Sequence, residues 1–209
     1  MPTQPRRRYV SAQRQESADA TRARVLDAAR ALFSEKGLDK VTIAEIAHAA
    51  GVAGSTVYAL FASKAGILRA LMQATLFGPA FQAAQATLAG VDDPVRLIEL
   101  TAGVARAIYE AESAELGVLR GAAAFSADLR ETEAEFEGIR RQMQKDRLDR
   151  LFAAGRARHD LSLAEAQQVM WMFTSRDVYR MLVHDGGWSP DQYQAWLART
   201  LVEALVERG

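Results

Sequence analysis

Helix start signals recur along the whole chain and limit what it can fold into. Residues 42–45 (TIAE) and 162–165 (SLAE) are capping boxes, in which a hydroxyl accepts from the third amide and a glutamate accepts from the cap amide. Asp93 and Ser189 each precede a proline. Aspartate and serine are favoured N-caps and proline is favoured as the first residue of a helix, so each pair marks a helix start. Proline is absent from Gln13 to Gly78, and no stretch shows sustained period-2 alternation. The sequence therefore predicts an all-α protein.

Glycines mark the expected helix ends. Gly37, Gly51, Gly90, Gly155 and the pair at 186–187 lie where the apolar periodicity lapses, which suits a left-handed residue after the last turn. Residues 78–79 (GP) are expected to interrupt a helix. Together these signals predict about nine helices, over residues 19–36, 42–50, 54–60, 64–89 with a break near Pro79, 93–112, 115–126, 128–157, 162–184 and 190–208.

Composition excludes several classes of protein. Cysteine is absent, so disulfides, thiolate zinc sites and cysteine nucleophiles are excluded. No apolar run approaches the roughly 18 residues of a membrane span. The basic residues 6–8 are followed by a polar stretch without an apolar segment, unlike a secretory signal. A cytoplasmic protein without a membrane partner is the expectation.

Charge is balanced over the whole chain and unbalanced between its parts. Residues 1–72 hold 11 basic and 6 acidic side chains, a net +5, while residues 73–209 hold 15 and 20, a net −5. Such asymmetry is consistent with a first part that meets a polyanion. A chance imbalance of this size is also common among ordinary domains, so the motifs have to decide.

The stretch from Thr21 to Leu71 has the spacing of a helix-turn-helix. Its first helix carries one apolar stripe, and a two-turn helix, a break at Gly51 and another short helix follow. The residues left to face outward on that last helix are mostly small, namely Gly54, Ser55, Thr56, Tyr58 and Ala59. Lys64 follows the expected cap Ser63 and places a positive charge beside free helix amides, where a phosphate is favoured. Thr42 lies at the start of the helix expected over 42–50, where free helix amides also favour a phosphate.

At these residues the sequence resembles the tetracycline-repressor (TetR) family of transcriptional regulators. A register held over fifty residues and four helix starts is far more specific than a bare helix-turn-helix pattern. The residues that fall at the spacings of the family are Thr21, Arg22, 25–33 (VLDAARALF), Gly37, 41–43 (VTI), Ile46, Ala47, 50–52 (AGV), 55–58 (STVY), Phe61, Ser63, Lys64 and Leu68.

Residues 1–17 contain two prolines and three consecutive arginines followed by polar residues, and they are expected to form a flexible basic arm. The resemblance implies a DNA-binding domain over 18–64 and an effector-binding and dimerisation domain over 65–209. It implies phosphate contacts from Thr42, Tyr58 and Lys64, and a base-facing surface at Gly54, Ser55, Thr56 and Ala59. A purely structural role stays open for two of these residues. Tyr58 could instead pack against the first helix, and Thr42 could instead only cap its own helix. The arm is equally consistent with an inert terminus.

The third helix departs from the pattern of the family. Many relatives carry an aromatic, histidine or basic residue where this sequence has Ala59 and Leu60. Bidentate readout by arginine or asparagine has no donor there. Specificity is therefore expected to come from methyl contacts of Thr56 and Ala59, backbone approach at Gly54 and DNA shape, with residues 6–8 reaching a minor groove.

No catalytic constellation is visible in the sequence. Glu45 and His48 form half of the Glu-x-x-His pattern of di-iron bundles, but a second copy is absent. No nucleophile elbow occurs, and three histidines without cysteine offer no metal cluster. The chain is expected not to be an enzyme and to need no cofactor or metal.

The C-terminal part is expected to dimerise. The run Met170-Trp171-Met172-Phe173 covers every face of its helix, so it needs apolar neighbours on both sides. The last helix carries an amphipathic stripe, and relatives commonly pair their final two long helices in a four-helix bundle. The interface residues expected on this basis are Met172, Tyr179, Trp196, Leu197, Leu201 and Leu205. The alternative is that both helices fill the core of one protomer.

Relatives usually bind a small effector in this domain, which implies a repressor released from a palindromic operator by a small, largely apolar molecule. Aromatic and methionine side chains with a few polar groups suit such a pocket, and the candidates are Arg106, Tyr109, Arg120, Phe125, Met143, Met170, Trp171 and Phe173. Most of these are expected to serve the core. A DNA-binding dimer without a small-molecule response is the alternative function.

Overall fold

The structure is a computed structural model that describes residues 6–111 and 127–207. Every regular element in these ranges is a helix, and the only strand-like pairing there is an isolated bridge between Ala157 and Val206. The chain forms two compact units, Met1–Met72 and Gln73–Gly209, whose boundary falls inside helix α4. The predicted all-α fold is confirmed, whereas the predicted segment 115–126 lies outside the described residues.

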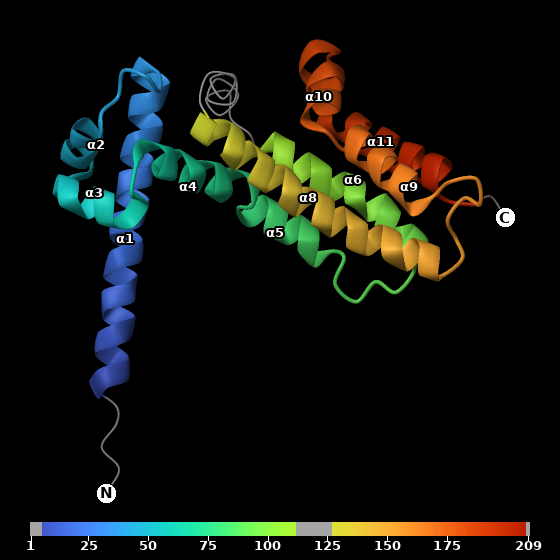
Figure 1. Cartoon of the computed structure of the whole chain (residues 1–209), viewed down its shortest axis with the longest axis horizontal. Helices are drawn as coiled ribbons and strands as arrows, with labels where there is room; N and C mark the ends of the chain where they lie inside the picture. The colour runs from blue at the N-terminus through green and yellow to red at the C-terminus, as the bar shows by residue number, and fades with distance from the viewer. Residues whose placement is uncertain (1–5, 112–126, 208–209) are drawn as a thin grey trace, which may run out of the picture. The chain divides into compact units, whose positions relative to one another are not determined.

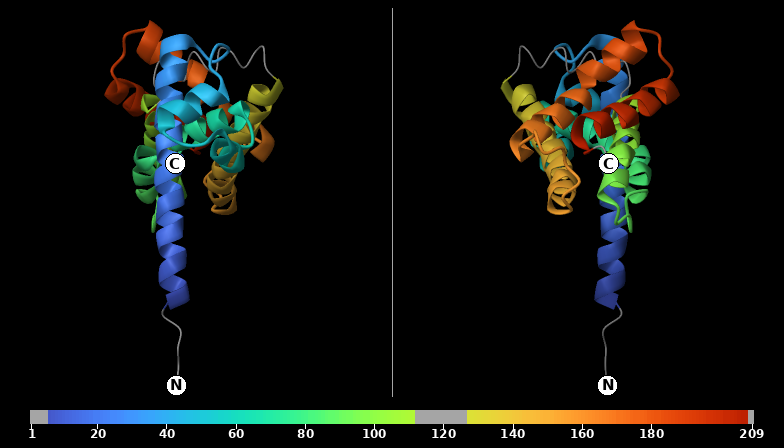
Figure 2. Two further views of the ribbon diagram at one scale, coloured as in Figure 1. Left: turned by 90° about the vertical axis from the view of Figure 1, so that its left-hand side faces the viewer. Right: turned by 90° about the vertical axis from the view of Figure 1, so that its right-hand side faces the viewer.

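The first unit contains α1 (Arg6–Lys36), α2 (Ile43–Ala50), α3 (Gly54–Phe61) and most of α4 (Lys64–Leu76). Figures 1 and 2 show that the N-terminal part of α1 extends well beyond α2 and α3. Residues 6–17, expected from the sequence to belong to a flexible arm, are thus helical here. Arginine and glutamine make up half of this segment, and both have high helix propensity.

The core of the first unit is formed by one face of each of its four helices. The apolar stripe expected on the first helix is buried, as are the inner faces of the two short helices that follow it. The buried side chains, none more than 7% exposed, are Val25, Ala29, Phe33, Ile46, Ala47, Ala50, Val57, Phe61, Ile67, Leu68 and Leu71. The sequence therefore identified the inward faces of this unit correctly.

A tight turn joins α3 to α4. Ala62 adopts a φ of 61°, a conformation that side chains with a Cβ rarely take. Ser63 caps α4 by accepting a hydrogen bond from the Gly66 amide at 3.0 Å. A Cβ on Gly66 would lie 1.8 Å from the carbonyl oxygen of Phe61, so only glycine fits this close approach of two helices.

The second unit contains the remaining helices. They are α5 (Pro79–Ala86), α6 (Pro94–Glu110), α8 (Ala127–Ala153), α9 (Leu163–Phe173), α10 (Arg176–Tyr179), the π-helix η1 (Arg180–Asp185) and α11 (Pro190–Leu205). The helix expected over 162–184 is therefore broken. The break follows Thr174, and the Ser175 hydroxyl starts α10 by accepting from the Val178 amide at 3.3 Å.

Helix α6 lies at the centre of the second unit, where it contacts α5, α8 and α11 (Figure 1). Helix α9 packs on α8 and α11. The apolar core is drawn from α6, α8, α9, α10 and α11, and its most deeply buried members include Ile98, Leu148, Leu151, Met170, Tyr193, Leu197, Leu201 and Leu205.

Within the described ranges, no single helix is both long and apolar enough to cross a membrane. Helices α2 and α3 reach the required hydropathy only as a pair, and they are bent by 107° relative to each other.

Replacing Gly66 by alanine is expected to destabilise the protein by about 2–4 kcal/mol, because the added Cβ would overlap the Phe61 carbonyl and force the helices apart. The matched control is Gly138→Ala on the exposed side of α8, where a Cβ would meet no atom within 4 Å. That change is expected to stabilise by about 0.5–1 kcal/mol. Urea unfolding measures both, and equal effects of the two changes would contradict the described turn.

Candidate functional site

A bent pair of short helices forms the first candidate site. The 107° angle between α2 and α3 lies in the range of helix-turn-helix motifs. Gly51 ends α2 with a φ of 64°, and its amide donates to the carbonyl of His48 at 3.1 Å. The Val52 amide then donates to Ala47 at 3.0 Å. This left-handed turn sets the direction in which α3 leaves α2.

An arginine from α1 holds the end of α3. The Arg22 guanidinium donates to the Leu60 carbonyl at 3.3 Å and lies 4.6 Å from the centre of the Phe61 ring. A cation is favoured at a helix C-terminus, and stacking on an aromatic face adds to the attraction. The sequence motif includes Arg22 but gives it no role, because its partner lies 38 positions away.

The outer face of α3 carries the residues expected to meet DNA bases. Ser55, Tyr58 and Ala59 are exposed, and Tyr58 keeps 57% of its surface. Gly54 and Thr56 are half-buried on the same short helix. Tyr58 therefore does not pack into the core, which removes the bland alternative considered for it. All five residues lie on this short helix, and their contact with DNA stays a prediction.

Thr42 is fully engaged as the N-cap of α2. Its hydroxyl accepts from the Glu45 amide at 3.2 Å and donates to the Glu45 carboxylate at 2.9 Å, while its own amide donates there at 2.8 Å. Lys36 reaches the same carboxylate at 3.0 Å. The Thr42 bonds and the Lys36 ammonium lower the pKa of Glu45 to about 2. Both polar groups of Thr42 are thus bound within the chain, and a phosphate contact would have to compete with Glu45.

Lys64 holds a loop in this structure. Its ammonium donates to the carbonyls of Leu38 at 2.9 Å and Val41 at 3.1 Å, and the residue is half-buried. Two of its three N–H groups are therefore used inside the unit. The phosphate contact expected for Lys64 stays a prediction, and its structural role is to fix the segment that leads into α2.

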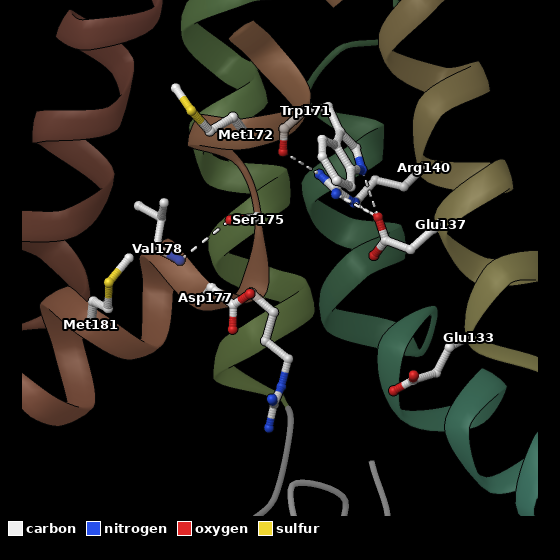
Figure 3. A pocket seen from close by; sticks show the side chains of 10 residues that line it. Glu133, Glu137, Arg140, Trp171, Met172, Ser175, Asp177, Val178 and Met181 are labelled. Atoms are coloured by element: carbon white, nitrogen blue, oxygen red, sulfur yellow. Dashed lines mark hydrogen bonds and ion pairs between the residues drawn. The ribbon is translucent and has the colours of Figure 1, made fainter. Parts of the chain in front are cut away.

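A cavity of about 580 Å³ in the second unit is the second candidate site (Figure 3). It lies between α8 and the α9–α10 break, and its size is within the range of small-molecule pockets. Its walls combine carboxylates, two arginines and large apolar groups, namely Glu133, Glu137, Arg140, Trp171, Met172, Ser175, Arg176, Asp177, Val178 and Met181. A smaller hollow of about 380 Å³ between α5 and α6 includes Arg106.

The guanidinium of Arg140 joins α8 to the end of α9 at the wall of this cavity. Arg140 is 6% exposed, and one of its terminal nitrogens donates to the Trp171 carbonyl, the Thr174 carbonyl and the Thr174 hydroxyl at 3.2, 3.2 and 2.8 Å. Its other nitrogens donate to Glu137 at 2.5 and 3.1 Å. The Trp171 indole N–H donates to the same Glu137 oxygen at 2.8 Å, and Figure 3 shows these three side chains turned toward one another. Arg140 thus caps the end of α9.

The predicted effector residues fall in different places. Trp171 lines the larger cavity, and Arg106 lines the smaller hollow, where it pairs with Glu110 and Asp191. Tyr109 and Met170 are buried in the core. The remaining described candidates are half-buried outside both hollows, namely Met143 and Phe173. Arg120 and Phe125 lie outside the described residues.

The predicted interface residues divide into two groups. Leu197, Leu201, Leu205 and Tyr179 are at most 3% exposed, so this chain already covers them and we assign them to the core. The apolar stripe of the last helix predicts which face is buried. It does not predict whether the same chain or a second copy covers that face. The other two keep exposed surface, Met172 with 48% exposed and Trp196 half-buried, and their place in an interface stays a prediction.

Neither site has the groups of a metal centre. Among the described residues, no group of three or more histidine, aspartate or glutamate side chains is arranged to hold a metal ion. His48, singled out in the sequence, is exposed in the last turn of α2.

The helix-turn-helix unit matches known proteins. Residues 25–71 match the family model of bacterial regulatory proteins of the tetR family. Over 57 residues the chain is 39% identical to the HTH-type transcriptional regulator TtgR of Pseudomonas putida. This match spans 27% of each chain, so it covers little more than a quarter of that relative's length.

The fold of nearly the whole chain matches solved structures. NalD, the secondary repressor of the MexAB-OprM multidrug efflux pump in Pseudomonas aeruginosa, superposes with a TM-score of 0.67 at 24% identity, over 93% of this chain and 100% of that chain. SmeT of Stenotrophomonas maltophilia, in a complex with triclosan, gives a TM-score of 0.69 at 21% identity, over 91% and 93%. Both units therefore have the fold of these regulators.

The Glu45 cap is expected to make stability depend on pH. Because the pKa of Glu45 is lowered to about 2 from an ordinary value of 4.5, its contribution is present above pH 4.5 and is lost as the pH falls through about 2. The difference in Tm between wild type and Glu45→Gln should shrink over that window. Thermal unfolding by circular dichroism measures it, with Glu35→Gln, an exposed α1 carboxylate outside the cap, as control. A constant difference between wild type and Glu45→Gln would contradict the described cap.

Proposed function

Because the N-terminal domain of this chain belongs to the TetR family, we propose that the protein is a transcriptional regulator that binds DNA through α3. The observation that carries the proposal is the exposed outer face of α3, held by the Gly51 turn and by Arg22. A helix with small outward side chains approaches the floor of a major groove closely. The net charge of +5 over residues 1–72 favours a polyanion at this unit.

Sequence readout is proposed to come from few base contacts. Thr56 and Ala59 offer methyl groups, and Gly54 has no atom within 4 Å of the position its Cβ would take, so DNA backbone or bases meet no obstacle there. We propose that Tyr58, which keeps more than half of its surface exposed, donates to a phosphate. DNA shape is proposed to supply the rest of the specificity.

We propose that the regulator acts as a homodimer on a two-fold symmetric operator. Exposed Met172 and Met181 and half-buried Trp196 leave apolar surface on the last helices of the second unit. Large apolar side chains that stay exposed in one chain support a surface for a second copy. Two recognition helices then read half-sites about one helical turn apart.

The larger cavity supports a small-molecule response. NalD and SmeT are described as repressors of multidrug efflux pumps, and SmeT has been solved with triclosan. We therefore propose that this chain is a repressor whose DNA affinity falls when an effector fills the cavity between α8 and the α9–α10 break. A DNA-binding dimer without such a response lacks an explanation for a hollow of this size.

Selection from a random duplex pool at near-physiological salt tests the function. The expected result is an enriched two-fold symmetric sequence, with half-sites about one helical turn apart and two chains per duplex. Light scattering of the complex gives the number of chains. Binding without any enriched sequence would contradict a sequence-specific regulator.

A charge on α3 tests whether that helix makes the contact. Ala59→Glu is expected to lower affinity for the selected duplex by about 100-fold or more, because it aims a carboxylate at the DNA. The control is Ala134→Glu on the exposed side of α8, which changes the net charge equally. Equal losses for both variants would show that α3 is not the recognition helix.

A further inference from the structure

A buried guanidinium on α8 has no carboxylate partner. Arg147 is 7% exposed, and its two terminal nitrogens donate to the Thr101 hydroxyl of α6 at 3.0 Å and to the Gln85 amide oxygen of α5 at 2.8 Å. Within the described ranges these neutral groups are its hydrogen-bond partners, and no carboxylate forms an ion pair with it. Because a buried charge without an opposite charge is costly, this position favours an anion.

The charged neighbours of Arg147 on α8 do not neutralise it. Asp146 is the adjacent residue, and adjacent side chains on a helix do not face each other. Its carboxylate is exposed and accepts from the Gln142 amide at 2.9 Å. Burial lowers the pKa of Arg147 to about 10, and the opposing effect of Asp146 is smaller. Arg150, one turn further along, is exposed and lies 3.9 Å from the carboxylate of Asp92, so it forms a pair of its own.

The two other helices around Arg147 supply no opposite charge either. Helix α5 contains no charged residue. On α6, Arg96 donates to Glu99 at 2.6 Å and Arg106 donates to Glu110 at 2.7 Å, so both carboxylates already have a cation. The α6 group that reaches Arg147 is a neutral hydroxyl. Arg147 therefore meets no carboxylate from α5, α6 or α8.

Helix α5 covers this guanidinium loosely. It buries none of its eight residues fully, and Gln85 itself is half-buried. The Gln85 oxygen accepts from Arg147, while its nitrogen donates to the Met143 sulfur at 3.0 Å, which is a weak acceptor. A short helix with so little buried surface opens more easily than the core. Displacement of one half-buried amide therefore uncovers the guanidinium.

Aromatic side chains continue along the same faces of α5 and α8. Phe81 precedes Gln85 by four positions on α5, and Phe136 precedes Arg147 by about three turns on α8. The ring of Phe77 joins these two faces, since its centre lies 5.0 Å from that of Phe81 and 5.5 Å from that of Phe136. The rise of a helix places Phe136 about 16 Å from Arg147 along α8. The faces of α5 and α8 are thus aromatic at one end and cationic at the other.

We propose that Arg147 binds the carboxylate of an amphiphilic organic acid, which enters beneath α5 and takes the place of the Gln85 amide. A carboxylate accepts two parallel hydrogen bonds from a guanidinium and brings the missing negative charge, whereas the Gln85 oxygen accepts one and brings none. The apolar part of the acid lies toward Met143 and the aromatic rings. None of these residues lines the cavity between α8 and the α9–α10 break, so the site is separate from the one in the proposed function.

Two probes of similar shape that differ in charge test the inference. Octanoate and its neutral amide, octanamide, are titrated separately into the full chain without DNA at pH 7, and isothermal calorimetry gives each Kd. We expect octanoate to bind at least about tenfold more tightly, because only the carboxylate neutralises the guanidinium. Equal binding, tighter binding of the amide, or binding of neither probe would overturn the inference.

Removal of the guanidinium locates the charge. Arg147→Met is expected to abolish the preference for octanoate, because the apolar contacts that remain bind both probes alike. The control is Lys145→Met, which removes an exposed cation of the same helix that pairs with Asp149 and is expected to keep the preference. Circular dichroism confirms that each variant is folded. A preference that survives in Arg147→Met, or that both variants lose equally, would overturn the inference.

A carboxylate built into α5 tests the same charge with Arg147 still in place. Gln85→Glu puts a negative oxygen where the amide oxygen now lies 2.8 Å from the guanidinium. This variant is expected to raise Tm by about 2–4 °C and to weaken octanoate binding by about tenfold or more. The control is Gln82→Glu at an exposed position of α5, which makes the same charge change and is expected to do neither. A Gln85→Glu protein with the Tm and the octanoate affinity of wild type would contradict the proposed site.

Discussion

A buried guanidinium at the end of α9 is the interaction on which the second unit depends. Arg140 meets the last carbonyls of α9 on one side and the Glu137 carboxylate on the other, while Thr174 also accepts from Tyr109 and Gln144. A helix that ends inside a protein leaves carbonyls without partners, and an uncompensated buried charge is costly. Arg140 meets both needs at once. Glu137, Arg140 and Trp171 also line the cavity. The contacts of Arg140 therefore hold both the wall of the cavity and the end of α9 at the helix break.

In the first unit, two other cations also bind backbone carbonyls that lack helical partners. Arg22 holds a carbonyl in the last turn of α3, and Lys64 holds two carbonyls of the segment before α2. Both helices are only eight residues long, and helices of that length need tertiary support to persist. With its end fixed from α1, α3 can leave its outer face free of packing. The exposed small residues that we propose to meet DNA are a consequence of this bracing.

Local sequence signals predicted the helices well. Contacts between residues far apart in the sequence could not be predicted from such signals. The capping boxes predicted at Thr42 and Ser162 and the N-cap predicted at Ser189 are all present, because a cap depends on residues at most three positions apart. Arg140 reaches Thr174 across 34 positions, and no periodicity reveals such a contact. The stripe of α11 predicts a dimer interface at Leu197 and its neighbours, whereas these side chains are buried within one chain, because an apolar stripe does not say which chain covers it. The sequence also predicts one helix over 162–184, although Ser175 supplies the cap for the break after Thr174.

The support that Arg140 gives to the second unit can be tested directly on the protein alone. The measurement is the free energy of unfolding of the Arg140→Met variant in urea, with Lys145→Met, which removes an exposed cation of the same helix, as the control. We predict that Arg140→Met lowers the free energy of unfolding by about 3–5 kcal/mol, because it leaves Glu137 and the last carbonyls of α9 without their partner. The control is expected to change it by less than about 1 kcal/mol. Equal losses for the two variants would contradict the account.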